Sequence, residues 1–316
     1  MKITVFDKAS IGMDLDYSPL SAYGTLTVYE TSTPDEVKAR LAGCEVAVIN
    51  KVKLSAEVLR SADALKLICI FATGYDNIDV QYCRERGIAV CNVVGYSTES
   101  VAQLTVAMAL SLYSHLSTYT AATASGWYSN QSSPNLLVPV YHELCGKTWG
   151  IVGYGNIGKK VACVAKAFGC KILAYKRNPD SPECTDLETL LRQSDIISLH
   201  TPLNARSRGM IGQEQIDMMD KKPIVINVAR GAVWDEAAMA KALAEGKISG
   251  LGCDVFSTEP FPVEHPFFAI KDAPNVCLTP HMAWASFEAR TRCLDEICQN
   301  IDAFQKGEQR NRVDLK

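Results

Sequence analysis

The sequence predicts an α/β protein built from two parallel sheets, each covered by helices. Short apolar runs rich in β-branched residues alternate with amphipathic stretches along most of the chain, which is the pattern of buried parallel strands joined by helices. One series of this kind fills roughly the first 95 residues, and a second begins near residue 148. The length of 316 residues also favours two domains over one.

The first series contains four predicted strands. They lie at residues 3–6, 45–49, 67–70 and 88–91. Helices are expected between them because the intervening stretches open with residues that favour helix starts, at 34–36, Ser55 and Asp79. These four β–α units predict one small open sheet.

A longer helix is predicted from Ser97 to about Tyr119, where Val101, Leu104 and Leu112 share an apolar stripe. The polar, turn-rich segment 125–134 that follows is typical of a long loop.

The second series contains six predicted strands with helices between them. The strands lie at residues 148–152, 171–174, 196–199, 224–227, 248–253 and 276–278. Six strands in this alternation predict a complete doubly wound sheet. A helical pattern returns from Trp284 to the end of the chain.

Composition limits the function classes. With 32 basic and 35 acidic residues the formal net charge is −3, so neither nucleic acid nor an anionic membrane surface is an expected partner. The first residues enter a strand without a signal-peptide pattern, and the most apolar window, 101–112, is too short to span a bilayer. The twelve cysteines show no C-x-x-C spacing and are expected to be buried thiols. We therefore expect a cytoplasmic protein without a metal site.

A glycine-rich turn provides the strongest local signal. Gly153, Gly155 and Gly158, with Asn156 and Ile157 between them, follow a predicted strand and open a predicted helix. In this position the glycines let backbone N–H groups and the helix N-terminus approach a pyrophosphate, so the turn predicts dinucleotide binding. The alternative is a plain glycine turn between a strand and a helix.

The end of the next predicted strand bears on the choice of cofactor. An acidic residue that binds the ribose hydroxyls of NAD usually stands there, but this chain has Lys176 and Arg177 instead. Two cations attract a 2′-phosphate, so NADP(H) is favoured and NAD(H) remains possible through other contacts.

Three polar residues follow three other predicted strands. Arg230 follows the strand at 224–227, Glu259 the one at 248–253, and His281 the one at 276–278. Because the carboxyl ends of parallel strands form the sites of α/β folds, these residues could converge on one crevice. Each alone would more often be a structural or surface residue, whereas their joint placement favours a catalytic set.

With these motifs the chain resembles the D-isomer-specific 2-hydroxyacid dehydrogenase family over nearly its whole length. The matching segments are 72–79, 150–158, 227–231, 254–260 and 280–285. The ending at 281–285 is most similar to the glycerate dehydrogenase and hydroxypyruvate reductase branch. The resemblance implies the reversible reduction of a small 2-oxo acid to the D-2-hydroxy acid with NAD(P)H.

The resemblance also implies a role for each site residue. His281 would be the general acid and base, Glu259 would favour its imidazolium form, and Arg230 would bind the substrate carboxylate and polarise the carbonyl. The backbone at Thr73 and Gly74 would add substrate contacts. Further cofactor contacts are expected at Asp254, beside the nicotinamide amide, at Thr201 and Pro202, near the adenine side, and at Thr105, Val228, Ala229 and His281.

The same resemblance sets the expected domain map. Residues 1–96 plus 285–316 would form a flavodoxin-like substrate domain, and residues 97–284 a Rossmann-like NAD(P)-binding domain. Homodimer formation is expected through the helix after Ser97 and the loop around Trp127.

Two other functions share this fold. One is oxidation of formate or phosphite, although formate dehydrogenases lack the glutamate partner that Glu259 supplies. The other is a binding protein that senses a dinucleotide without turnover, against which the intact set of Arg230, Glu259 and His281 argues.

Overall fold

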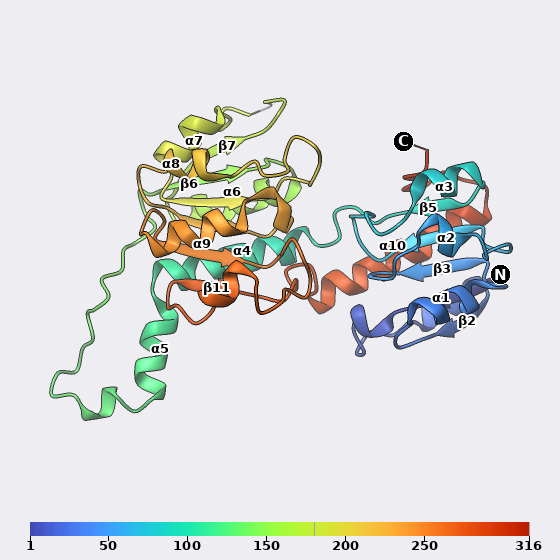
Figure 1. Cartoon of the computed structure of the whole chain (residues 1–316), viewed down its shortest axis with the longest axis horizontal. Helices are drawn as coiled ribbons and strands as arrows, with labels where there is room; N and C mark the ends of the chain where they lie inside the picture. The colour runs from blue at the N-terminus through green and yellow to red at the C-terminus, as the bar shows by residue number, and fades with distance from the viewer. Residues whose placement is uncertain (180, 316) are drawn as a thin grey trace. The chain divides into compact units, whose positions relative to one another are not determined.

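The computed structural model describes residues 1–179 and 181–315, and the chain divides into two compact units (Figure 1). Unit 1 consists of Met1–Ser97 and Ala285–Lys316, and unit 2 consists of Thr98–Trp284. Each unit is a parallel sheet with helices on both faces, which confirms the predicted α/β class. No helix in the described part of the chain is both long and apolar enough to cross a membrane.

Unit 1 contains a five-stranded parallel sheet of order β2-β1-β3-β4-β5, which is the flavodoxin-like order. Its strands are β1 (Lys2–Val5), β2 (Thr25–Val28), β3 (Val46–Ile49), β4 (Leu67–Ile70) and β5 (Ala89–Cys91). Its helices are α1 (Pro34–Leu41), α2 (Ala56–Leu59), α3 (Val80–Glu85) and α10 (Phe287–Gln305).

The predicted helix starts in unit 1 are confirmed. Thr33 and Glu36 form a reciprocal capping box at α1, while Ser55 and Asp79 cap α2 and α3 by accepting backbone N–H groups. The prediction of four strands is wrong, because β2 also joins the sheet by parallel pairing with β1. This strand is mostly exposed at the sheet edge, so its sequence, TLTV, lacks the apolar run that marks a buried strand.

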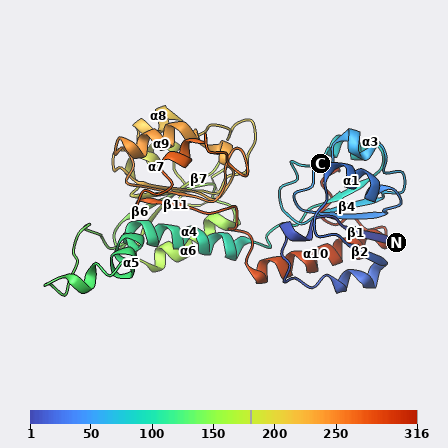
Figure 2. The same cartoon turned by 60° about the horizontal axis from the view of Figure 1, so that its bottom comes forward.

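Unit 1 buries apolar side chains above and below its sheet. On one face, Val37 and Leu41 of α1 and Leu59 of α2 pack with strand residues such as Ile49 and Ile68. On the other face lies α10, whose apolar side includes buried Leu294 and Ile297 (Figure 2). The C-terminal helix therefore belongs to the fold of the N-terminal sheet. It begins at Phe287, where Ser286 caps it, rather than at Trp284 as predicted.

Unit 2 contains a six-stranded parallel sheet of order β11-β10-β9-β8-β6-β7, which confirms the predicted doubly wound sheet. Its strands are β6 (Thr148–Val152), β7 (Lys171–Tyr175), β8 (Ile196–Leu199), β9 (Ile224–Asn227), β10 (Gly250–Cys253) and β11 (Val276–Leu278). Its helices are α4 (Thr98–Tyr113), α5 (Leu116–Ala124), α6 (Asn156–Ala167), α7 (Leu187–Gln193), α8 (Gln213–Asp217) and α9 (Glu236–Ala244).

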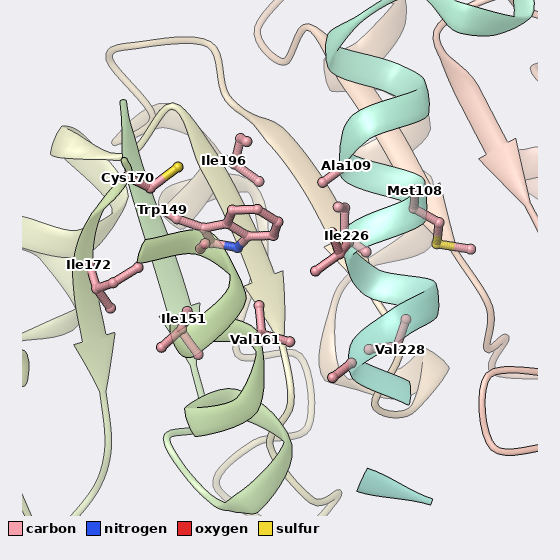
Figure 3. Packing of buried hydrophobic residues seen from close by; sticks show 14 of the residues in the cluster. Met108, Ala109, Trp149, Ile151, Val161, Cys170, Ile172, Ile196, Ile226 and Val228 are labelled. Atoms are coloured by element: carbon pink, nitrogen blue, oxygen red, sulfur yellow. The ribbon is translucent and has the colours of Figure 1, made fainter. Parts of the chain in front are cut away.

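Two apolar layers enclose the sheet of unit 2. On one face Trp149 and Ile226 pack against Met108 and Ala109 of α4 and Val161 of α6 (Figure 3). On the other face, residues of α7, α8 and α9 cover the sheet. The fully buried indole of Trp149 donates to the Ser198 hydroxyl at 2.9 Å, so its one polar group is satisfied.

Two predictions in and around unit 2 need correction. The single helix expected over 97–119 is broken at His115, whose φ of +50° lies outside the helical region, so α5 starts as a separate helix. The expectation of buried cysteines is wrong for Cys145 and Cys163, which are exposed.

Candidate active site

The three glycines of the predicted phosphate-binding turn differ in what a side chain at their position would meet. Gly153 has a φ of +100°, and a Cβ there would lie 2.6 Å from the backbone of His200 and Thr201. A Cβ on Gly158 would lie 2.3 Å from the Gly153 carbonyl oxygen. By contrast, a Cβ on Gly155 would meet nothing within 4 Å. Gly153 and Gly158 are therefore required by packing, whereas Gly155 borders open space at the start of α6.

This space fits the pyrophosphate of a dinucleotide. Gly155 is the N-cap of α6, a helix of 12 residues, and the N-terminus of a helix presents backbone N–H groups and a partial positive charge. A side chain at Gly155 would occupy part of this space. The backbone of Gly155, Asn156 and Ile157 is thus the part of unit 2 suited to hold the phosphates.

Two neighbouring strands bring other predicted residues to this turn. The Gly153 N–H donates to the Tyr175 carbonyl at 2.9 Å, which places the end of β7, followed by half-buried Lys176 and exposed Arg177, beside the glycine turn. Thr201 lies against Gly153. Burial lowers the pKa of His200 to about 3, so this ring is neutral at pH 7.

Arg230 lies in the turn after β9, three residues beyond Asn227. The Asn227 side chain holds this turn, because its Nδ2 donates to the Arg230 carbonyl at 2.9 Å and its Oδ1 accepts the Ala229 N–H at 3.0 Å. The half-buried Arg230 guanidinium donates to the Ala229 carbonyl at 2.7 Å.

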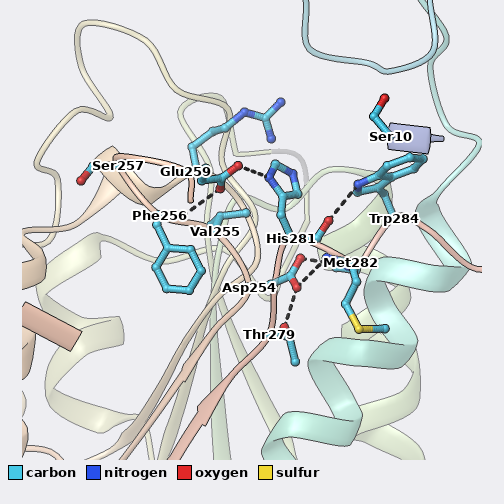
Figure 4. A network of polar contacts seen from close by, with 12 residues as sticks. Ser10, Asp254, Val255, Phe256, Ser257, Glu259, Thr279, His281, Met282 and Trp284 are labelled. Atoms are coloured by element: carbon cyan, nitrogen blue, oxygen red, sulfur yellow. Dashed lines mark hydrogen bonds and ion pairs between the residues drawn. The ribbon is translucent and has the colours of Figure 1, made fainter. Parts of the chain in front are cut away.

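His281 and Glu259 form a hydrogen-bonded pair beyond β11 and β10 (Figure 4). The distance from His281 Nδ1 to Glu259 Oε2 is 2.6 Å, and the side chains are 23% and 30% exposed. The Phe256 N–H donates to the other oxygen of the Glu259 carboxylate at 3.0 Å, and this bond fixes the orientation of the carboxylate. The pair is therefore ordered by the protein yet remains accessible from solvent.

A buried carboxylate supports the segment that carries His281. Asp254 is fully buried and accepts the N–H groups of Met282 and Ala283 at 2.9 Å and the Thr279 hydroxyl at 2.5 Å (Figure 4). Burial raises the pKa of Asp254, while these three hydrogen bonds oppose that rise. His281 has a φ of +53°, a conformation that costs a non-glycine residue about 1–2 kcal/mol. The contacts of Asp254 hold the backbone in this strained state.

Arg230, Glu259 and His281 thus follow three strands that are neighbours in the sheet, while the glycine turn follows β6 at the same, carboxyl edge. A guanidinium can bind a carboxylate, and a histidine paired with a carboxylate can give or take a proton. Together with a pyrophosphate cradle, these groups define a dinucleotide-dependent oxidoreductase.

Comparisons with known proteins identify the family. Residues 106–283 match the model of the "D-isomer specific 2-hydroxyacid dehydrogenase, NAD binding domain". A glycerate dehydrogenase from Methylorubrum extorquens is 40% identical over 90% of this chain and 91% of its own. A hydroxypyruvate reductase from Blautia hydrogenotrophica is 36% identical over 99% of both chains. The structure of D-lactate dehydrogenase from Aquifex aeolicus, complexed with NAD and lactic acid, matches with a TM-score of 0.84 and 31% identity over 98% of this chain and 96% of that one.

The chain therefore belongs to the D-isomer-specific 2-hydroxyacid dehydrogenase family. It is an oxidoreductase that uses a nicotinamide dinucleotide to interconvert small 2-oxo acids and D-2-hydroxy acids. A dinucleotide-sensing protein without turnover is not favoured.

The predicted substrate loop lies in unit 1, after β4. The Thr73 hydroxyl donates to the Val93 carbonyl at 2.6 Å, and Asn92 donates to the Thr73 carbonyl at 2.7 Å. The side chain of Asn77 ties the same loop to the loop after β3 by donating to the Asn50 and Val52 carbonyls. Hydrogen bonds thus anchor this loop at Thr73 and at Asn77.

The remaining expected cofactor contacts have different surroundings. Val228 and Ala229 are buried at the end of β9, and Pro202 is exposed next to Thr201. Thr105 is fully buried in α4, where its hydroxyl donates to the Val101 carbonyl at 2.7 Å. Contact of these residues with a cofactor stays a prediction.

Two features of the molecule were missed in the sequence. One is Asp7, whose buried carboxylate holds the loop after β3, and the other is the buried pair of Glu236 and His265. Asp7 lies two residues after β1 and Glu236 is the first residue of α9, so their positions in the fold, rather than a sequence motif, indicate their roles.

Proposed function

We propose that this protein reduces hydroxypyruvate or glyoxylate to the corresponding 2-hydroxy acid, with NADPH as the preferred cofactor. The observation that carries the catalytic assignment is the 2.6 Å contact between His281 Nδ1 and Glu259 Oε2, beyond strands that neighbour β9, after which Arg230 lies. The names of the relatives support the substrate class, since they include glycerate dehydrogenase and hydroxypyruvate reductase.

Each residue of the set has a distinct task in reduction. Arg230 binds the substrate carboxylate through its planar fork and polarises the neighbouring carbonyl. Because Nδ1 of His281 is bonded to Glu259, Nε2 is the nitrogen that donates the proton to the developing alkoxide. Glu259 stabilises the protonated ring and fixes its orientation. When bound, the nicotinamide cofactor supplies the hydride.

Most of the residues that would hold the cofactor follow the carboxyl ends of strands in the unit 2 sheet, and Thr105 lies within α4. The backbone of the glycine turn would bind the pyrophosphate, and Asp254 would lie near the nicotinamide amide. Further contacts would come from Thr105, Thr201, Pro202, Val228 and Ala229. In unit 1, the backbone at Thr73 and Gly74 would add hydrogen bonds to the substrate carboxylate.

The preference for NADPH is argued from the residues beside the glycine turn. Lys176 directly follows β7, and the bond from Gly153 to the Tyr175 carbonyl fixes that strand end to the turn. A cation there attracts a 2′-phosphate, whereas the strand end lacks the acidic residue that usually accepts the ribose hydroxyls of NAD.

We further propose a cytoplasmic homodimer. Helix α5 and the segment after it expose a group of apolar side chains, namely Leu116, Trp127, Tyr128, Leu137, Val138, Val140 and Tyr141. A second copy of the chain would remove this apolar surface from water. Size-exclusion chromatography with light scattering tests the dimer, and a monomeric mass at micromolar concentration would contradict it.

The test of the function is a substrate panel with both cofactors. Purified protein is supplied with NADPH or NADH and with hydroxypyruvate, glyoxylate, pyruvate or a branched 2-oxo acid, and cofactor oxidation is followed by absorbance. We expect turnover that is fastest with hydroxypyruvate or glyoxylate, a product of D configuration from hydroxypyruvate, and a higher kcat/KM with NADPH. Absence of turnover across the panel would refute the activity, and a strong preference for NADH would refute the cofactor assignment alone.

A further inference from the structure

A second histidine–glutamate pair, His265 and Glu236, is buried in unit 2. His265 is 8% and Glu236 is 9% exposed, and the distance from His265 Nε2 to Glu236 Oε2 is 3.0 Å. Neither residue belongs to the proposed catalytic set. A buried carboxylate is costly unless its oxygens accept hydrogen bonds, so its partners indicate what it does.

The hydrogen bonds of His265 fix its ring as a neutral donor. Its Nδ1 accepts the Phe267 N–H at 3.2 Å, where His265 caps a short 3₁₀ helix, Pro266–Ala269. Nε2 must therefore carry the hydrogen that is donated to Glu236. The ring also packs among Phe256, Phe261 and Phe267, with centroid distances of 5.9, 5.0 and 5.2 Å. His265 thus holds the Glu236 carboxylate in place.

The Glu236 carboxylate in turn holds the turn that carries Glu259. Its Oε1 accepts the Ser257 N–H at 2.8 Å, and its Oε2 accepts the Ser257 hydroxyl. The preceding N–H, of Phe256, donates to Glu259 Oε1 at 3.0 Å. Two consecutive backbone N–H groups therefore bind two different carboxylates, one buried and one at the site.

The same two residues contact the turn that follows Arg230. A Cβ on Gly231 would lie 2.0 Å from the Phe256 carbonyl carbon and 2.1 Å from the Ser257 nitrogen, so the two backbones touch. The backbone of Phe256 and Ser257 is consequently the junction between the Arg230 turn and the Glu259 turn.

We propose that Glu236, held by His265, is a positioning residue that fixes Glu259 against His281. This inference rests on the proposed function of Glu259 and His281. Loss of the Glu236 carboxylate frees the Ser257 N–H and lets the turn 256–259 rotate, so the Phe256 N–H no longer holds Glu259 in line with the imidazole. Glu236 touches neither the reacting atoms nor the cofactor cradle and acts only through Glu259.

A double-mutant cycle tests this route of action. Glu236→Gln keeps the shape of the side chain but turns one acceptor into a donor that faces the donors around it. In the otherwise unchanged enzyme we expect kcat for 2-oxo acid reduction to fall at least tenfold, with KM for the dinucleotide unchanged within twofold. In a Glu259→Gln background the same substitution should lower kcat less than twofold, because the residue through which it acts is already lost.

A spectroscopic readout tests the position of Glu259 without turnover. The proton on His281 Nδ1, in a 2.6 Å hydrogen bond to a carboxylate, should give a far-downfield NMR signal that His281→Gln removes. Glu236→Gln should remove or shift this signal. The control is Asp195→Asn. This substitution also removes a carboxylate that accepts hydrogen bonds from a backbone N–H and from a lysine side chain. Asp195 lies at the start of β6 and β8, which is the edge of the sheet opposite the site. The control should leave the signal and kcat unchanged.

The outcomes separate the inference from the proposed function. If Glu236→Gln lowers kcat by the same factor in both backgrounds, or leaves both kcat and the His281 signal unchanged, the inference is overturned. If instead Glu259→Gln alone has no effect on kcat, the proposed role of Glu259 has failed first.

Should Glu236→Gln not fold, His265→Phe carries the test, because it keeps the aromatic packing and removes the donor to Glu236. We then expect a threefold loss of kcat that is absent in the Glu259→Gln background, and equal losses in the two backgrounds would overturn the inference.

Discussion

The two units share one strand order around the point where the order of the strands reverses, but the residues at that point have opposite roles in the two units. In unit 2 the reversal lies between β6 and β8, and the turn after β6 is built from glycines that leave space at the start of α6. In unit 1 it lies between β1 and β3, and the residue after β1 and Phe6 is Asp7. Ligands of open α/β sheets bind at such reversal points.

In unit 1 this point holds the carboxylate of Asp7. It accepts the N–H groups of Asn50, Lys51 and Val52 at 3.0, 2.6 and 3.2 Å and the Ser10 hydroxyl at 3.0 Å. The backbone N–H groups of the loop after β3 are therefore used within unit 1, whereas a Cβ on Gly155 in unit 2 would meet nothing within 4 Å. One strand order thus yields a rigid scaffold in one unit and a cofactor site in the other.

The largest expected effect comes from the catalytic edge of unit 2. Replacing His281 with Gln removes the proton donor but leaves the glycine turn intact, so kcat should fall by about 10²–10⁴, or roughly 3–5 kcal/mol, with cofactor affinity near normal. Steady-state kinetics and a cofactor titration measure both quantities. An unchanged kcat would remove His281 from its role.

The next largest effect is expected in unit 1. Asp7→Asn replaces a buried acceptor of four hydrogen bonds with an amide whose NH₂ faces donors, so the free energy of unfolding should fall by about 2–3 kcal/mol. Thermal unfolding measures the loss. Asp16→Asn is the matched control, because Asp16 is exposed, accepts hydrogen bonds from Ser18, and should cost less than about 0.5 kcal/mol when changed. Equal losses in the two variants would contradict the assigned role of Asp7.

A smaller effect, on binding alone, is expected at the glycine turn. Gly155→Ala places a methyl group in open space without a clash, so melting should not change, while the dinucleotide Kd should rise about tenfold, or 1.4 kcal/mol. Gly212→Ala is the control, since Gly212 is also a helix N-cap and a Cβ there meets nothing closer than 3.7 Å. If both variants bind the cofactor as the unchanged protein does, the open space at Gly155 is not the phosphate position.

The smallest effect concerns the choice between the two cofactors. Lys176→Gln removes one partly exposed charge, so kcat/KM with NADPH should fall about fivefold, or 1 kcal/mol, while that with NADH should not fall. Lys171→Gln, at the opposite end of β7, is the control and should change neither value. A similar loss with both cofactors would show that Lys176 does not contact the 2′-phosphate.

Part of the fold and of the candidate site could be predicted from the sequence. The sequence predicts the glycine turn and the strand-end residues Arg230, Glu259 and His281. Each of them has a characteristic chemistry and follows a strand of the βα pattern, so its position can be predicted without the fold. Strand β2 was missed because an exposed edge strand has no apolar run, and the break at His115 because a positive φ at histidine leaves no signal in the sequence. Asp7 and Glu236 were missed because their function depends on N–H groups 43–45 and 21 residues away, which only the fold brings together.

The most direct test of the comparison is a calorimetric titration of NADPH into the unchanged protein, Asp7→Asn and Gly155→Ala. We expect one site per chain, an equal Kd for the unchanged protein and Asp7→Asn, and binding about tenfold weaker for Gly155→Ala. Two sites per chain, or a loss of affinity in Asp7→Asn as large as that in Gly155→Ala, would contradict this expectation.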